Sequence, residues 1–167
     1  MTLFLFLLAL IAAPVDSDAA IFQLVADELG PDLLVANRTL PFCGAPPCLR
    51  DRDVIAALKR AAGDRYAAFE ARNRASMDIA PLQGRVRMES PDVIARAMDV
   101  GGWDELHCLY PDARAVVYFS APAYVGDDAI VYFEEACDWQ CGSGWYVRFT
   151  RDGKRWKIVE RVDLWVS

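Results

Sequence analysis

Residues 137–167 read Cys-Asp-Trp-Gln-Cys-Gly-Ser-Gly-Trp-Tyr-Val-Arg-Phe-Thr-Arg-Asp-Gly-Lys-Arg-Trp-Lys-Ile-Val-Glu-Arg-Val-Asp-Leu-Trp-Val-Ser. Two runs in this stretch, residues 145–150 and 155–166, are rich in Val, Ile, Tyr, Phe and Trp, the residues that favour strands. The pair Asp152-Gly153 separates these runs, and an Asp-Gly pair in such a position is the strongest short-range signal for a β-hairpin. The stretch therefore predicts a C-terminal hairpin.

Two more runs of the same kind, residues 115–120 and 129–136, precede the hairpin, and turn-forming residues separate all four runs. Consecutive strands joined by short turns form an antiparallel meander. Most helical patterns come earlier in the chain, where apolar residues recur at helical spacing after capping residues. The helices predicted in this way cover residues 20–29, 51–62, 64–73 and 90–101, and two further strands are expected at 33–40 and 84–89.

This order of elements predicts one α+β domain over residues 20–167. Its N-terminal helices pack on one face of a C-terminal antiparallel meander of about four strands. The formal charge of the 167-residue chain is −6, and nucleic-acid-binding domains are usually strongly basic, so no nucleic-acid partner is expected. The sequence contains no Walker loop and no dinucleotide fingerprint, and no cofactor is predicted.

Residues 1–19 have the features of a secretory signal peptide. The apolar run at 3–13 is shorter than the roughly 20 residues that span a membrane. The small residues Ser17 and Ala19 mark a cleavage position after Ala19. No Lys or Arg precedes the apolar run, so an uncleaved anchor or a misassigned start stays open as an alternative. We predict a periplasmic or secreted protein with no stable membrane span after signal removal.

Five cysteines support an oxidising compartment. Cys43 and Cys48 bracket one turn-rich loop, and Cys137 and Cys141 bracket another, so each pair is close enough to form a local disulfide. Crossed pairings are equally compatible with the sequence. In the local pairing, Cys108 remains free.

Several landmarks occur together between residue 103 and the C-terminus. They are Trp103, Leu109-Tyr110-Pro111, Tyr118-Phe119-Ser120, Cys141-Gly142-Ser143-Gly144-Trp145-Tyr146, Gly153, Trp156-Lys157-Ile158 and Trp165-Val166-Ser167. This pattern resembles a group of uncharacterised exported bacterial proteins over about residues 103–167. The segment 121–124 departs from it, because Ala-Pro-Ala-Tyr stands where an Arg-Val-Gly-Phe-like run is expected. The resemblance implies an exported α+β domain and carries over no catalytic residue, because the group has no established activity.

Glu160 is the strongest candidate for chemistry. Alternation with a period of two places it in the middle of a strand face that carries Trp156, Ile158 and Val162. A carboxylate on an apolar face has a raised pKa unless a cation pairs with it, and such a group can act as a general acid or base in a pocket. The alternative is a β-bulge near Val159 that turns Glu160 to solvent.

Two other patterns are weaker. His107, the only histidine, would complete a zinc site with Cys108, Cys137 and Cys141, but adjacent ligands and a Cys-x₃-Cys spacing are unusual for zinc. No metal is therefore predicted. Ser143 lies between two glycines but lacks the strand–turn–helix setting of a catalytic serine.

The last hairpin also carries a strip of basic residues among its aromatic ones. This basic strip consists of Arg148, Arg151, Lys154, Arg155, Lys157 and Arg161. It is suited to an anionic partner, or else it is a solvated face with charge pairs across the strands.

We predict an exported binding protein whose contact residues are Trp139, Trp145, Arg148 and Trp165, since aromatic and Arg side chains commonly anchor interfaces. Its partner would be an unidentified protein, glycan or small molecule. The alternative is a small-ligand-binding or hydrolytic domain with a pocket between sheet and helices, in the manner of cystatin-like or nuclear-transport-factor-like folds, in which Glu160 acts. Whether the protein is an enzyme stays open.

Overall fold

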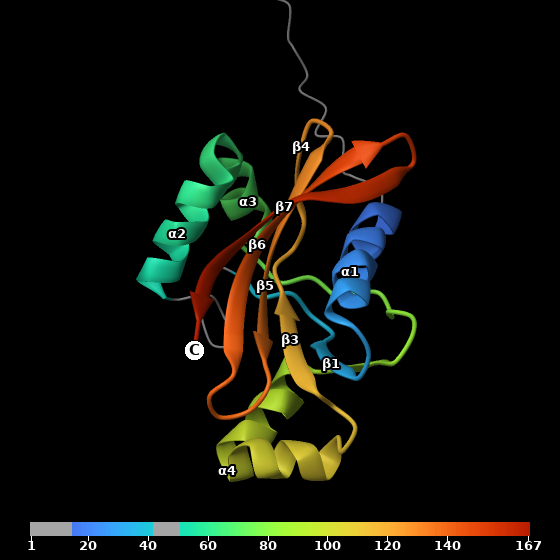
Figure 1. Cartoon of the computed structure of the whole chain (residues 1–167), viewed down its shortest axis with the longest axis vertical. Helices are drawn as coiled ribbons and strands as arrows, with labels where there is room; N and C mark the ends of the chain where they lie inside the picture. Colours follow the sequence, from blue (N-terminus) through green and yellow to red (C-terminus); the bar gives the residue numbers. More distant parts are fainter. Residues whose placement is uncertain (1–14, 42–50) are drawn as a thin grey trace, which may run out of the picture.

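A seven-stranded mixed sheet organises the computed structural model, which describes residues 15–41 and 51–167. The strands are β1 (Leu33–Ala36), β2 (Val86–Glu89), β3 (Ala115–Phe119), β4 (Ala123–Val125), β5 (Asp128–Ala136), β6 (Gly142–Asp152) and β7 (Arg155–Val166). Their order across the sheet is β2-β1-β3-β5-β6-β7, and β4 also pairs with β5. The helices in the same residues are α1 (Val15–Leu29), α2 (Arg52–Ala62), α3 (Tyr66–Arg72) and α4 (Pro91–Leu109), shown in Figure 1.

The C-terminal meander is confirmed. β5 pairs antiparallel with β3 and with β6, and β6 pairs antiparallel with β7. Asp152 pairs with Arg155, so Gly153 and Lys154 form a two-residue turn. Gly153 has a φ of +62°, which suits the first position of a two-residue hairpin turn, and Asp152 is the last residue of β6 rather than part of the turn.

The α+β class is also confirmed, but the expectation of about four strands behind N-terminal helices is wrong. β1 lies in the sheet between β2 and β3 and runs parallel to both. Helices α2 and α3 separate β1 from β2 in the chain, and α4 separates β2 from β3. Parallel neighbours need such long connections, so no local turn signal in the sequence marks their pairing.

Helices cover both faces of the sheet rather than one. On the first face, Phe22 of α1 packs in a core with Val131 and Phe149; we call this the α1 face. On the second, Leu58 of α2 packs with Tyr132 and other residues of the opposite strand parity; we call this the α2–α3 face. Figure 1 shows α1 on one side of the strands and α2 and α3 on the other. A third core joins α4 to β1 and β3 at one end of the sheet.

The predicted helix boundaries rest on capping residues that act as expected. The carboxylate of Asp51 accepts hydrogen bonds from the backbone amides of Asp53 and Val54, at 2.8 and 3.1 Å, and begins α2. Ser90 begins α4 in the same way, with Pro91 in the first helical turn. The expected end of that helix near residue 101 is only a kink at Gly102, where φ is +62°, and helical structure resumes as far as Leu109.

Helix α1 begins before the predicted cleavage position and runs through it. Asp18, which is 6% exposed, accepts a 2.5 Å hydrogen bond from the Tyr124 hydroxyl and forms a 2.9 Å ion pair with Arg72. Burial and this hydrogen bond raise the pKa of Tyr124. Cleavage after Ala19 would remove the carboxylate that these two side chains share. No helix in the described residues is long and apolar enough to cross a membrane.

A chain that begins at Ala20 should therefore be less stable than one that begins at Val15. Removing the Asp18 carboxylate leaves Tyr124 and Arg72 without their shared partner, and charged hydrogen bonds of this kind contribute about 2 kcal/mol. Urea unfolding followed by tryptophan fluorescence measures the difference. The substitution Asp18→Asn in the longer chain isolates the charge from the lost helical turn. Equal midpoints for all three chains would contradict the stabilising role of Asp18.

Candidate functional site

A row of residues from four adjacent strands crosses the α2–α3 face. Tyr118 of β3 pairs with Glu134 of β5, Glu134 pairs with Gly144 of β6, and Gly144 pairs with Trp165 of β7. We call these four residues the Glu134 row. Tyr118, Glu134 and Trp165 are all partly exposed, so a ligand can reach their side chains.

Gly144 allows the Trp165 ring to lie across the sheet. A Cβ atom on Gly144 would lie 1.9 Å from Nε1 of Trp165, far closer than any real contact. From this position Nε1 donates a 2.9 Å hydrogen bond to the hydroxyl oxygen of Tyr132. The same hydroxyl donates a 2.6 Å hydrogen bond to Oε1 of Glu134. The three side chains therefore form a relay in which Trp165 orients Tyr132 and Tyr132 holds the carboxylate.

The Glu134 carboxylate has no positively charged partner among the described residues. No Lys, Arg or His forms an ion pair with it in the part of the chain that the structure describes. Burial raises the pKa of Glu134, and the hydrogen bond from Tyr132 opposes that rise only in part. Burial, followed by the nearby Glu134 charge, raises the pKa of Tyr118 to about 12. The site thus holds a reachable carboxyl group whose negative charge is uncompensated.

A chain of ion pairs occupies the same face beside this row. Asp128 accepts from Nη2 of Arg65 at 2.6 Å and lies 3.4 Å from Nη1 of Arg148. Nε of Arg148 in turn donates to Glu160 at 2.8 Å. Every charge in this chain has an opposite charge next to it, which distinguishes it from Glu134.

The predicted face of Glu160 is wrong, and the alternative of a bulge near Val159 is confirmed. Phe149 pairs with Ile158 but Arg148 pairs with Glu160, so one residue of β7 is left over between them. Glu160 therefore lies on the α2–α3 face, opposite to Ile158, and its side chain is 40% exposed. A raised carboxylate pKa requires that no cation pairs with the group, and Glu134 meets that condition in the described residues whereas Glu160 pairs with Arg148.

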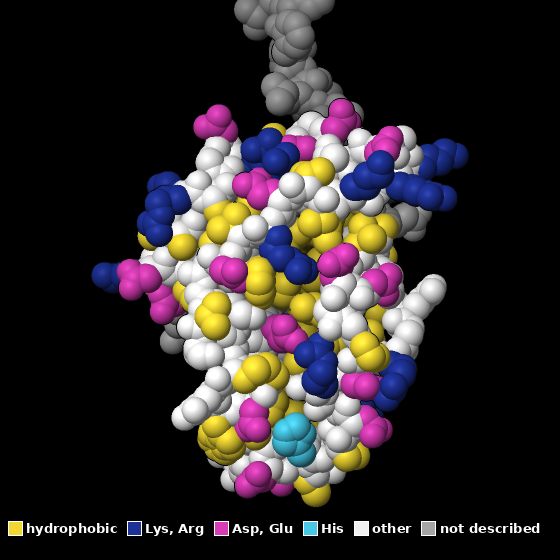
Figure 2. Space-filling model, viewed as in Figure 1, with side chains coloured by type: hydrophobic (Ala, Val, Ile, Leu, Met, Phe, Trp, Pro, Cys, Tyr) yellow, Lys and Arg dark blue, Asp and Glu magenta, His cyan; other side chains and the backbone are white. Residues whose placement is uncertain are grey.

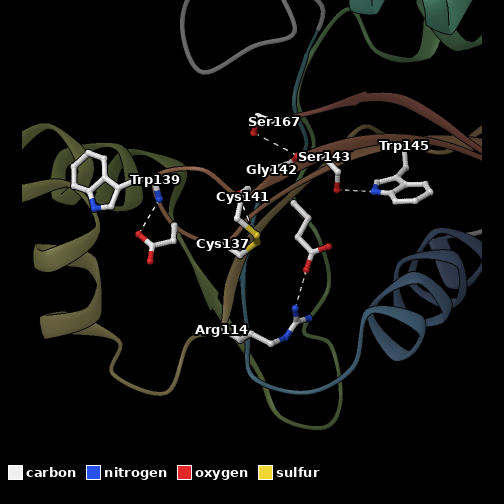
Figure 3. Close-up of a disulfide and its surroundings, with 10 residues drawn as sticks. Arg114, Cys137, Trp139, Cys141, Gly142, Ser143, Trp145 and Ser167 are labelled. Atoms are coloured by element: carbon white, nitrogen blue, oxygen red, sulfur yellow. Dashed lines mark hydrogen bonds and ion pairs between the residues drawn. A yellow bond between two sulfur atoms is a disulfide. The ribbon is translucent and has the colours of Figure 1, made fainter.

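The Cys137–Cys141 disulfide is confirmed and shapes the loop between β5 and β6. Trp139 in this loop is 69% exposed, yet its ring passes over Gly102, where an added Cβ would lie 2.5 Å from it. Because Gly102 has no side chain, the Trp139 ring can pack directly against the kink of α4. Figure 3 shows the Trp139 side chain beside the helix and the Trp145 side chain pointing the opposite way.

Trp145 lies on the α1 face and is held by contacts within the molecule. Its ring stacks against Phe133 with centroids 6.4 Å apart, and its Nε1 donates a 2.7 Å hydrogen bond to Ser143. The guanidinium of Arg161 lies 5.1 Å from its ring centroid. The four predicted contact residues are therefore not brought together on one surface. Trp139 lies at α4, Trp145 on the α1 face, and Arg148 and Trp165 on the α2–α3 face.

The basic strip is interleaved with acidic partners. Lys157 forms an ion pair with Asp152, and Arg148 pairs with Glu160. Figure 2 shows basic side chains next to acidic ones over this side of the molecule. These charge pairs favour the interpretation of a solvated face.

The remaining sequence candidates that the structure describes do not form a site. Cys43 and Cys48 lie outside the described residues. Cys108 is free and exposed, and the His107 ring lies 5.8 Å from that of Trp103. Within residues 15–41 and 51–167, no three His, Cys, Asp or Glu side chains gather in a way that could hold a metal ion.

Sequence reasoning missed Glu134 and Tyr132, although a signal for both was present. Alternation along residues 129–136 places Ile130, Tyr132 and Glu134 on one strand face. Glu134 is therefore a carboxylate on a largely apolar strand face, which is the same pattern that Glu160 shows on the last strand.

Comparison with known proteins adds no functional assignment. No protein-family profile, no curated protein and no solved structure matches this chain.

The close approach of Trp165 to Gly144 gives the first test of this geometry. Gly144→Ala should lower the free energy of unfolding by about 1–3 kcal/mol, because the new methyl group forces the indole off the sheet. In a Trp165→Ala background the same substitution should cost much less, since the clash is gone. Urea unfolding of the four proteins of this double-mutant cycle measures the coupling. A cost that is equal in both backgrounds would show that the indole does not occupy this position.

The raised pKa of Glu134 gives the second test. Ionising this carboxyl is harder in the folded protein than in the unfolded chain, so its destabilising effect is absent at low pH and grows as pH rises through the folded pKa. Glu134→Gln, which keeps an acceptor for Tyr132, should therefore raise the melting temperature at pH 8 and change it little near pH 4.

Glu135 provides the matched control for this substitution. It lies next in the chain and forms a 3.0 Å ion pair with Arg114. Glu135→Gln should be neutral or slightly destabilising, because exposed pairs of this kind contribute at most about 1 kcal/mol. If Glu134→Gln destabilises the protein at pH 8 as much as Glu135→Gln does, burial of the ionised Glu134 carboxylate does not destabilise the folded state.

Proposed function

We propose that this protein is an exported binding protein that recognises an organic cation at the Glu134 row. The observation that carries the proposal is the Glu134 carboxylate, which is partly buried, is hydrogen-bonded by Tyr132 and has no basic partner in the described residues. A ligand with an ammonium or guanidinium group supplies the missing positive charge. The sequence features of residues 1–19 and the Cys137–Cys141 disulfide support the export part of this proposal.

Aromatic rings around the carboxylate favour the same class of ligand. Tyr118 and Trp165 flank Glu134 along the row, and Tyr132 lies against it through a hydrogen bond. The faces of Trp and Tyr rings attract cations, and each such contact contributes about 0.5–2 kcal/mol, depending on how far the cation is desolvated. The hydrogen bond from Trp165 to Tyr132 fixes the phenol before the ligand arrives, so less order has to be created on binding.

Binding is supported more strongly than hydrolysis. The Glu134 row contains one carboxyl group and no serine, cysteine, threonine or histidine that would act as nucleophile or second proton carrier. Of the four contact residues expected from the sequence, only Trp165 belongs to this site. Trp139 and Trp145 instead contribute contacts inside the molecule.

Calorimetry with choline and with its neutral isostere 3,3-dimethylbutanol tests the proposal at pH 8. Choline should bind and the uncharged alcohol should bind at least about tenfold more weakly, a difference of about 1.4 kcal/mol. Nα-acetyl-lysine amide and Nα-acetyl-arginine amide serve as further probes for primary ammonium and guanidinium groups. Lowering the pH through the raised pKa of Glu134 should weaken binding of each cation, because the protonated carboxyl no longer attracts it.

Variants locate the site. Glu134→Gln should reduce the affinity for the best cationic probe at least about tenfold, whereas Glu135→Gln should leave it within about twofold of the original. Trp165→Phe, which keeps a ring but removes the donor to Tyr132, should reduce it less. Equal affinity for the cation and its neutral isostere, or unchanged binding by Glu134→Gln, would reject the proposal.

A further inference from the structure

A cleft of about 280 Å³ opens where the three parallel strands β1, β2 and β3 begin, and none of its lining residues belongs to the Glu134 row. Its walls come from the ends of β1 and β2 and from the loop that joins α4 to β3. The charged and aromatic side chains that line it are Asp32, Arg85, Arg87, Tyr110 and Asp112. This volume is slightly below the roughly 300–1,000 Å³ of sites for drug-sized ligands, so it suits a molecule the size of one amino acid.

Arg87 lies over a buried aromatic ring in this cleft. Its guanidinium carbon lies 4.8 Å from the centroid of the Tyr110 ring. Tyr110 is 6% exposed, and its hydroxyl donates a 2.8 Å hydrogen bond to Glu89, so the ring cannot easily move. A guanidinium stacked on a ring keeps the N–H donors along its edge available. Arg87 has no ion pair with any described residue.

The other charges of the cleft define what Arg87 would bind. Arg85 is already neutralised by Asp32, with Nη2 and Oδ1 2.6 Å apart. The Asp32 backbone is held by hydrogen bonds to Arg85 and from Arg114, at 2.8 and 2.7 Å, in a left-handed conformation with φ +66°. Asp112 has no ion pair among the described residues. The cleft thus offers one free guanidinium and one free carboxylate.

We propose that this cleft binds an α-amino carboxylate, either a free amino acid or the carboxyl-terminal residue of a peptide. The ligand's carboxylate accepts two parallel hydrogen bonds from the edge of Arg87, a geometry in which Arg and carboxylate groups are complementary. Its amine or amide N–H is directed to Asp112. The two arginines and two aspartates of the lining have no net charge, so the cleft favours a ligand with a single carboxylate over a multiply charged anion such as phosphate.

Titration of the arginine Nε–Hε signals in ¹⁵N–¹H NMR spectra tests this proposal. L-alanine should shift the Arg87 signal, and L-alanine amide, which lacks the carboxylate, should not. Inorganic phosphate should bind more weakly than L-alanine. A tripeptide that ends in alanine, compared with its C-terminal amide, distinguishes the two sources of the ligand. Tighter binding of the free amino acid indicates a metabolite, and tighter binding of the tripeptide with loss on amidation indicates a chain terminus.

Substitutions on the exposed side chain of Arg87 complete the test without disturbing the core. Arg87→Gln should lower the affinity for the better ligand at least about tenfold, and Arg87→Lys should lower it less, because lysine keeps the charge but not the fork. Arg96→Gln, an exposed arginine of α4 that is outside the cleft, should leave the affinity unchanged. Absence of binding by every carboxylate at about 10 mM, or binding that survives Arg87→Gln, would overturn the proposal.

Discussion

Burial of both faces of β5 is the constraint on which the rest of the structure depends. Residues 129–133 of this strand are buried without alternation, because α1 covers one face and α2 and α3 cover the other. A polar group on such a strand is removed from water, so it needs a hydrogen-bond or ion-pair partner inside the protein. Without that partner, its burial destabilises the fold. The hydroxyl of Tyr132 accepts a hydrogen bond from Trp165 and donates one to Glu134. The carboxylate of Glu134 receives a hydrogen bond from Tyr132 but has no opposite charge next to it in the part of the chain that the structure describes.

The long edge strand β7 adapts to this arrangement through two irregularities. The register with β6 shifts between Arg148 and Phe149 and again between Gly144 and Trp145. Each shift changes which side chains face α2 and α3, so Trp165 reaches the same face as Glu134. A straight strand with unbroken alternation would place these side chains differently. The bulges also interrupt the exposed edge of the sheet, which protects such an edge from pairing with another chain.

Each of the two proposed binding sites contains an oriented charge without an ion-pair partner in the described residues. The charge is negative at Glu134 and positive at Arg87. Among the ionised residues near the sheet, Arg148 and Asp128 have partners close at hand, and their contribution is structural. Glu134 and Arg87 are oriented by aromatic neighbours but lack an opposite charge in the described residues. An oriented charge without a partner costs little further order when a ligand binds, and this is why these two residues carry the functional proposals.

The sequence by itself determined the local features of this protein. The hairpin turn that Asp152-Gly153 marks, the strands of the meander and the capping residues Asp51 and Ser90 all depend on residues close together in the chain. The sequence allowed the Cys137–Cys141 disulfide but left crossed pairings open, and the structure selected the local pair. Only the tertiary structure decided the parallel position of β1, the two covered faces of the sheet and the bulge that moves Glu160 to the face opposite Ile158. These features depend on contacts between residues far apart in the chain, and a shift of one residue in register changes the face of every side chain that follows.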